Sequence, residues 1–184
     1  MDLVYSVKIY PMKKNDRIKK TAELTMEKIR FLARHIRNVE DNCVILAEKL
    51  LEQGEIDLAR NLVANGMVHD SSKFFGIEWD HLSTNQPAEE ENSKLKIKMA
   101  IHHHQKTNPH HIEYWPNGIR GMPDVYLAEM VCDLKARSEE FGTSLRDYVE
   151  NDGLKRWGIS KETDIYKKID KFITLLCFTP FQKI

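Results

Sequence analysis

The chain has 184 residues, enough for one domain with a substantial core but short for two. Basic and acidic residues each number 28, so the basic excess typical of nucleic-acid-binding proteins is absent. The three cysteines are far apart, no apolar run approaches the ~20 residues of a membrane helix, and no signal-peptide pattern is present. We therefore expect a cytoplasmic protein with no membrane segment and no strong nucleic-acid signal.

The first predicted elements are a short extended segment and a long helix. Apolar and polar residues alternate over residues 3–10, just before Pro11, which is the pattern of a strand or extended arm. From about Thr21 the apolar residues recur at helical spacing, and Gly54 is a natural stop for that helix. His35 lies inside the predicted helix.

The second predicted helix runs from Ile56 to Val68 and presents His69 and Asp70 at its C-terminal end. Adjacent side chains on a helix point roughly 100° apart, so these two can reach one object only if it lies beside the helix end. A divalent cation could bind both side chains at such a position, because imidazole and carboxylate are both good ligands for it. The dipeptide alone is weak support for a metal site.

The next segment carries a dense histidine cluster. Residues 84–92 are polar and predict an exposed loop, after which Ser93 is a plausible N-cap for a third helix. This helix leads into His102–His104, where an Asn-Pro dipeptide ends it, and His110 and His111 follow at once.

A fourth helix is predicted from Pro123 to Phe141. Glu129, Asp133 and Arg137 are spaced by four along it and therefore share one face. Two more helices are predicted near residues 144–157 and 162–176. No internal repeat or linker is visible, so the sequence predicts a single all-α domain over residues 1–184, a bundle of about six helices with a short N-terminal extended segment.

Seven of the eight histidines fall in three places, namely His35, His69, and the cluster of His102–His104 with His110 and His111. Neutral imidazoles crowded together would repel one another once protonated, unless a cation orders them. The clustering therefore favours metal binding over isolated structural histidines.

In this pattern the sequence resembles the HD-domain superfamily of metal-dependent phosphohydrolases. That helical family binds metal through a histidine, a His-Asp pair and a later aspartate, which correspond here to His35, His69 with Asp70, and Asp133. The resemblance covers residues 26–142 and leaves the helices of residues 144–176 outside the motifs. The sequence is also similar to a small bacterial and phage family with HDxSKF, NxHH and EMVCD motifs.

Two further features refine the resemblance. Lys73 stands where the HD-x-x-K members carry a lysine that contacts the substrate phosphate, whereas the related 5′-nucleotidases have a glutamate. The segment from His104 to His110 and His111 is similar to the histidines with which binuclear members bind a second metal. The N-x-H-H spacing favours His104 over His102 and His103, although the choice among these three stays open.

The resemblance implies a phosphohydrolase that cleaves a phosphomonoester or phosphodiester of a small molecule, such as a nucleotide, with a metal-activated water. The expected cofactor is a pair of divalent transition-metal ions, Mn, Fe, Co, Ni or Zn, with Mg possible. Asp70 would act at the reacting centre, and Lys73 and Arg137 would offset phosphate charge. Arg137 could equally form an ion pair with Glu129 or Asp133. Glu78 is a candidate for proton transfer or for support of a ligand.

Two other functions stay open at this stage. Some HD proteins hold a di-iron centre and oxidise small alcohols or phosphonates with dioxygen, and their ligands overlap with this set. A non-catalytic module could instead bind a nucleotide beside a structural metal, although such a site needs no open coordination position. The expected partner is a small phosphorylated substrate, and a homo-oligomer is compatible with the sequence.

Overall fold

The computed structural model describes residues 14–82 and 91–177. Both ranges fold into helices and turns without a strand, which confirms the predicted all-α class. The extended segment predicted over residues 3–10 and most of the loop predicted over residues 84–92 lie outside the described ranges. None of the described helices is both long and apolar enough to cross a membrane.

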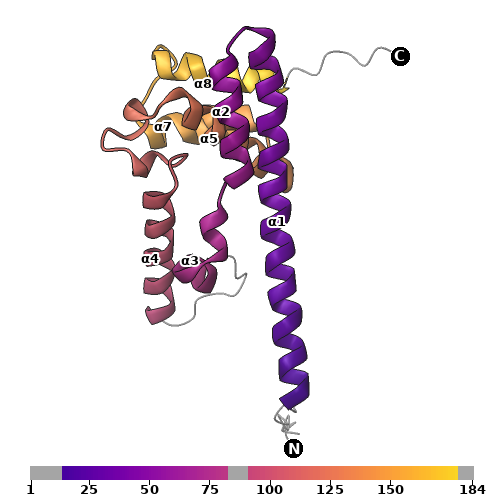
Figure 1. Cartoon of the computed structure of the whole chain (residues 1–184). Coiled ribbons are helices and arrows are strands. Elements are labelled where there is room, and N and C mark those ends of the chain that lie inside the picture. The colour runs from indigo at the N-terminus through magenta and orange to yellow at the C-terminus, as the bar shows by residue number, and fades with distance from the viewer. Residues whose placement is uncertain (1–13, 83–90, 178–184) are drawn as a thin grey trace, which may run out of the picture.

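The longest helix, α1 (Lys14–Glu52), organises the molecule (Figure 1). After a tight turn at Gly54, where φ is +80°, α2 (Ile56–Val68) folds back along α1. Two later helices, α5 (Asp124–Phe141) and α8 (Asp164–Cys177), also pack against α1. These four helices enclose the main core.

A second group of helices lies beside this bundle. A 3₁₀ turn and the short helix α3 follow the His-Asp pair, and α4 packs against α3. Two 3₁₀ turns then connect α4 to α5, and a short helical segment connects α5 to α8 (Figure 1). The bounds of these elements are η1 Ser71–Phe74, α3 Gly76–His81, α4 Glu91–Thr107, η2 Ile112–Tyr114, η3 Gly118–Gly121, α6 Leu145–Tyr148, the π-helical turn η4 Val149–Gly153, and α7 Leu154–Trp157.

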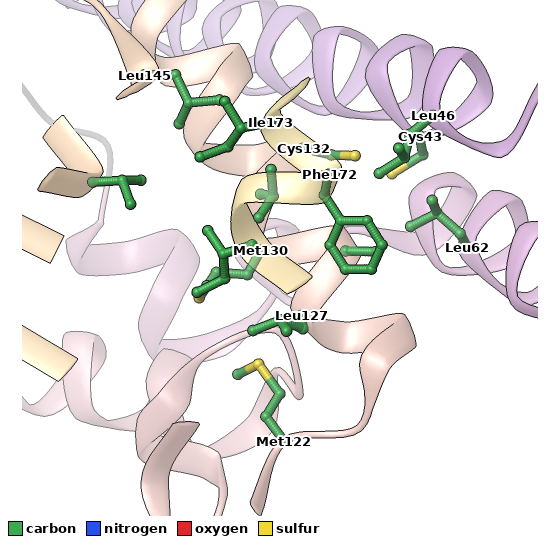
Figure 2. Packing of buried hydrophobic residues seen from close by; sticks show 14 of the residues in the cluster. Cys43, Leu46, Leu62, Met122, Leu127, Met130, Cys132, Leu145, Phe172 and Ile173 are labelled. Carbon is green, nitrogen blue, oxygen red and sulfur yellow. The ribbon is translucent and has the colours of Figure 1, made fainter. Parts of the chain in front are cut away.

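The apolar core lies where α1, α2, α5 and α8 meet (Figure 2). From α1 it receives Val39, Cys43, Leu46 and Leu50, whose spacing of three and four residues keeps them on one face of the helix. Figure 2 shows Leu46 and Cys43 of α1 near Leu62 of α2, with residues of α5 and α8 on the other side. The same face of α1 continues toward its N-terminus through the buried His35.

Several element boundaries differ from those predicted. Helix α1 begins at Lys14 and not near Thr21. Residues 18–24 are solvent-exposed, and Ile18 has no large apolar neighbour at helical spacing before Leu24, so no apolar stripe marks the start of the helix. Helix α4 begins at Glu91, which places Ser93 inside the helix and makes its predicted N-cap role wrong. The helix predicted over residues 144–157 is interrupted by η4, and η1 and α3 were not predicted.

Candidate metal centre

His35 reaches the centre from the middle of α1. It lies on the buried face of the helix, between Leu32 and Val39, and its side chain is almost fully enclosed. Its Nδ1 lies 2.9 Å from Oε1 of Glu140, and its Nε2 lies 3.1 Å from Oδ1 of Asp133. Both carboxylates come from α5, so the packing of α5 on α1 sets the position of the imidazole.

His69 and Asp70 form a turn and do not lie on a helix, which corrects the helical arrangement assumed from the sequence. Helix α2 ends at Val68, His69 is extended, and Asp70 has φ +53° and ψ +16°. This left-handed conformation is uncommon for residues other than glycine, but aspartate adopts it more readily than most, and such strain often occurs at functional sites. The turn, rather than the 100° helical offset, directs both side chains to one point.

The remaining histidines converge through the break after α4. The Asn108 side chain ties the end of the helix to the His-Asp turn, because its Nδ2 donates to the carbonyl of His104 (2.8 Å) and to Oγ of Ser72 (3.0 Å). The chain then reverses so that His110 is buried and Nε2 of His111 lies 2.9 Å from Nε2 of His104. Two segments thereby present their imidazoles to the same space.

Asp70 lies between two groups of imidazoles. Its Oδ2 is 3.5 Å from Nε2 of His69 and 3.8 Å from Nε2 of His35. Its Oδ1 is 3.3 Å from Nε2 of His104 and 3.4 Å from Nε2 of His110. One carboxylate therefore faces a different pair of histidines with each oxygen.

The donor atoms fit metal ions. Three groups have ligand atoms within 4.8 Å of one another: Asp70 with His104, His110 and His111; His35 with His69 and Asp70; and His69 with His110 and Asp133. Within the described residues, six buried side-chain polar atoms have no hydrogen-bond partner. Five belong to this cluster: Nε2 of His35, His69 and His110, and Oδ1 of Asp70 and Asp133. Buried polar atoms in proteins nearly always have a partner, and a cation would supply the missing one here.

A second set of carboxylates orients the imidazoles from behind. Glu129 uses Oε1 for two histidines, at 2.9 Å from Nδ1 of His69 and 3.2 Å from Nδ1 of His110. Glu78 is fully buried, and its Oε2 lies 2.8 Å from Nδ1 of His104. A carboxylate at Nδ1 favours the tautomer whose Nε2 lone pair is available to a metal ion.

The electrostatics of two carboxyl groups and one imidazole favour the protonation states that metal binding requires. Burial alone would raise the pKa of Asp70, but the neighbouring His69 lowers it below its usual value. Burial of Asp133 is likewise outweighed, chiefly by its interaction with the imidazole of His35, and its pKa lies well below the usual value. Burial lowers the pKa of His111 to about 3, so this imidazole is neutral near pH 7. Ionised carboxylates and neutral imidazoles are the forms that bind metals. At His69, by contrast, burial lowers the pKa less than Asp70 and the other nearby carboxylates raise it, so its pKa lies above the usual value.

Residues 25–175 match the model of a family of unknown function, DUF5662. The chain belongs to this family. No curated protein and no solved structure matches the chain. The matched region of this DUF5662 protein contains the whole cluster, from His35 to Glu140.

A pocket of about 380 Å³ opens onto the cluster of this DUF5662 protein. It exposes three residues of the cluster, three cationic side chains, an amide and an apolar wall. The cluster residues are His104, His111 and Asp133, and the cations are Lys73, Arg137 and Arg156. The amide is Gln105, and the apolar wall consists of Phe31, Leu32, Leu82 and Ile101. A pocket of this size with apolar walls and a few convergent polar groups is typical of a small-molecule site.

The structure brings all seven sequence-predicted ligands, from His35 to Asp133, into one cluster. Of the three consecutive histidines, only His104 belongs to it. The His103 side chain is half exposed and lies 2.7 Å from Oε1 of Glu78, and His102 is exposed.

The candidate catalytic residues lie around the cluster. Lys73 contacts Oδ2 of Asp70 and lines the pocket. Arg137 also lines the pocket, and it pairs with Glu140 at 3.2 Å, so the alternative pairing with Glu129 or Asp133 was wrong. Glu78 contacts Nδ1 of His104, a geometry compatible with support of a ligand, and both of its predicted roles stay predictions.

Sequence reasoning missed Glu140 and recognised Glu129 only as a neighbour of Asp133. A helical signal was present, since Glu129, Asp133, Arg137 and Glu140 follow one another at intervals of four, four and three residues. What the sequence lacked was the identity of the helix facing this stripe. The structure shows that α1 and the His-Asp turn supply the imidazoles there.

Proposed function

We propose that this protein is a metal-dependent phosphohydrolase that cleaves a phosphomonoester or phosphodiester of a small molecule, such as a nucleotide. The observation that carries the proposal is the position of Asp70 between two imidazole groups, beside a pocket lined by three cations. Two groups that share a carboxylate are the arrangement expected for a pair of ions. The same ligand set is what the HD-domain resemblance implies, and membership of that superfamily is part of the proposal.

The donor atoms divide into two sites. His35, His69, Asp70 and Asp133 would hold one ion, and Asp70, His104, His110 and His111 would hold the other. Mixed nitrogen and oxygen ligands suit Mn, Fe, Co, Ni or Zn, whereas Mg prefers oxygen ligands alone. Divalent ions bound there would supply Lewis acidity, which polarises a phosphoryl oxygen and lowers the pKa of a water molecule.

The pocket side chains account for substrate binding. Lys73 and Arg137 line the same pocket as Asp133, so their cationic groups border the space next to the ligand cluster. In the proposed reaction they bind phosphoryl oxygens and stabilise the negative charge that develops on them. Glu140 holds Arg137 through a 3.2 Å ion pair, which restricts the guanidinium to its place in the pocket lining.

Glu78 has a positioning role in this proposal. Both of its carboxylate oxygens are occupied, by Nδ1 of His103 and Nδ1 of His104, and the residue is fully buried. It therefore keeps His104 oriented and does not exchange protons with a substrate.

The proposal is tested by assaying phosphate release from nucleotides and phosphodiesters with purified protein loaded with Mn, Fe, Co, Ni, Zn or Mg. Hydrolysis of at least one substrate class with a bound transition metal is expected. Iron-dependent oxygen consumption without phosphate release would contradict the proposal and favour the di-iron oxygenase. Absence of both activities across the panel would also contradict it.

Lys73→Ala sharpens this test. The variant should keep its metal content and lose about 10²-fold in phosphohydrolase activity, because a cation that stabilises the transition state is removed. Lys168→Ala is the matched control, since Lys168 also pairs with an aspartate, Asp124 at 2.7 Å, but does not line the pocket. Unchanged kinetics of Lys73→Ala would refute the role of Lys73 in substrate binding.

A further inference from the structure

Arg156 is a third cation of the pocket, and neither the ligand cluster nor the motifs of the sequence account for it. It comes from α7, after the end of the motif-bearing region. Its Nη2 donates to Oε1 of Glu113 at 3.0 Å, and its side chain is 51 % exposed. Arg156 thus combines a defined position with access to solvent and to the pocket.

The ion pair with Glu113 does not by itself explain the presence of Arg156 in the pocket. An ion pair at this exposure contributes little to stability, because water and salt screen it. A guanidinium, however, carries five N–H donors in a planar fork, so it can hold Glu113 and bind an anion at the same time. Glu113 fixes the direction of the fork, which lowers the entropy lost when a ligand binds.

The position of Arg156 differs from that of the other two cations. Lys73 contacts Asp70, and Arg137 lies one helical turn after Asp133 and pairs with the carboxylate that holds His35. Arg156 instead pairs with Glu113, in the turn that follows the histidine cluster. The pocket therefore has two cations next to the ligand cluster and one cation on a separate element.

We infer that Arg156 binds a second anionic group of the substrate, and that the substrate is a small phosphorylated molecule with a phosphate or carboxylate set apart from the reacting phosphoryl group. The inference rests on the proposed function, since it assumes that the reacting phosphoryl group lies at the ligand cluster. The pocket volume of about 380 Å³ exceeds what one phosphate ion fills, and its apolar wall would contact the linking atoms.

Paired non-hydrolysable probes test this inference in the metal-loaded protein. Phosphonocarboxylates with two, three or four methylene groups between phosphonate and carboxylate are compared with alkylphosphonates of the same chain length by isothermal titration calorimetry. The best phosphonocarboxylate is expected to bind about tenfold more tightly than its alkylphosphonate, because one charge-assisted hydrogen bond is added.

Variants identify the residue responsible. Arg156→Gln should remove the tenfold difference without changing alkylphosphonate affinity, and Arg156→Lys should restore part of it. Arg146→Gln is the matched control, because Arg146 is similarly exposed and pairs with Asp170 away from the pocket. It should leave both affinities unchanged. Circular dichroism of each variant checks that the fold is retained.

The outcomes separate this inference from the proposed function. Equal binding of the two probe types by the wild-type protein, or a difference that survives in Arg156→Gln, would overturn the inference while leaving the phosphohydrolase intact. Failure of every phosphonate to bind the metal-loaded protein would overturn the proposed function itself.

Discussion

Two clusters of buried side chains lie between helices α1 and α5, one apolar and one polar. One is apolar, with Leu46 of α1 and Val131 of α5 fully enclosed among aliphatic side chains. The other begins a few turns along the same helices, where His35 meets Asp133 and Glu140. Both clusters are largely buried, although the pocket opens onto the polar one, and of the two only the polar cluster contains buried atoms without hydrogen-bond partners.

This difference separates two sources of stability. In the apolar cluster each contact stabilises the fold directly, through removal of apolar surface from water and close packing. In the polar cluster each buried atom without a partner costs about 1–3 kcal/mol. The apolar half therefore supports a polar half whose unpartnered atoms a cation could satisfy, and ions bound there would stabilise the native state by mass action.

The largest effect is expected from Asp70→Ala, which removes the carboxylate shared by both ligand groups. Elemental analysis should show loss of both ions, because both groups lose the carboxylate that they share and the group around His104 is left with imidazoles alone. His111→Ala is the comparison variant, since His111 belongs to one group and should cost a single ion. Full retention of one ion in Asp70→Ala would show that the carboxylate is not shared.

Leu46→Ala should weaken the apolar cluster alone. Loss of a fully buried leucine is expected to lower the free energy of unfolding by about 2–5 kcal/mol, measured by denaturant titration. Metal content should stay at the wild-type value. Chelation should lower the melting temperatures of wild type and variant to a similar extent, because distant sites act additively. A variant that lost its metal would show that the two clusters are coupled.

Glu129→Gln is the smallest of these changes and acts only through the imidazoles that Glu129 holds. The amide keeps the size of the side chain but weakens the support of His69 and His110, so affinity for metal should fall about 10–100-fold. Competition with a coloured chelator measures this fall. Glu139→Gln, an exposed change on the same helix, is the control. An unaltered affinity in Glu129→Gln would assign this carboxylate to the fold alone.

The sequence was most informative where apolar residues recurred clearly at helical spacing. The apolar period and the stop at Gly54 predicted α2 with its observed bounds, Ile56–Val68. The resemblance to the HD pattern, together with the order of His35, the His-Asp pair and Asp133 on successive elements, predicted side chains that the structure brings together. These predictions depend on local periodicity and on motif order, both of which are visible in one chain.

The rest depends on contacts between distant residues. The left-handed conformation of Asp70 has no local signature, since aspartate is compatible with many backbone states. The partnership of Glu140 with His35 joins residues 105 positions apart and requires knowledge of how α5 lies on α1. In the early turns of α1 only Ile18 is a large apolar residue before Leu24, so no hydrophobic period marked the start of the helix.

Gly66 has no side chain, and its small size determines how closely α2 approaches α1 near the candidate metal centre. A Cβ at residue 66 would lie 2.9 Å from Cβ and 3.1 Å from Sγ of Cys43, so α2 can approach α1 this closely only with a hydrogen there. His69 follows Gly66 by three residues, and His35 precedes Cys43 by about two helical turns. The distance between the backbones of α1 and α2 at Gly66 therefore influences the distance between the imidazoles of His35 and His69. The separation of the ligands thus depends on a residue that has no side chain and whose carbonyl accepts a hydrogen bond from the backbone N–H of His69 at 3.3 Å.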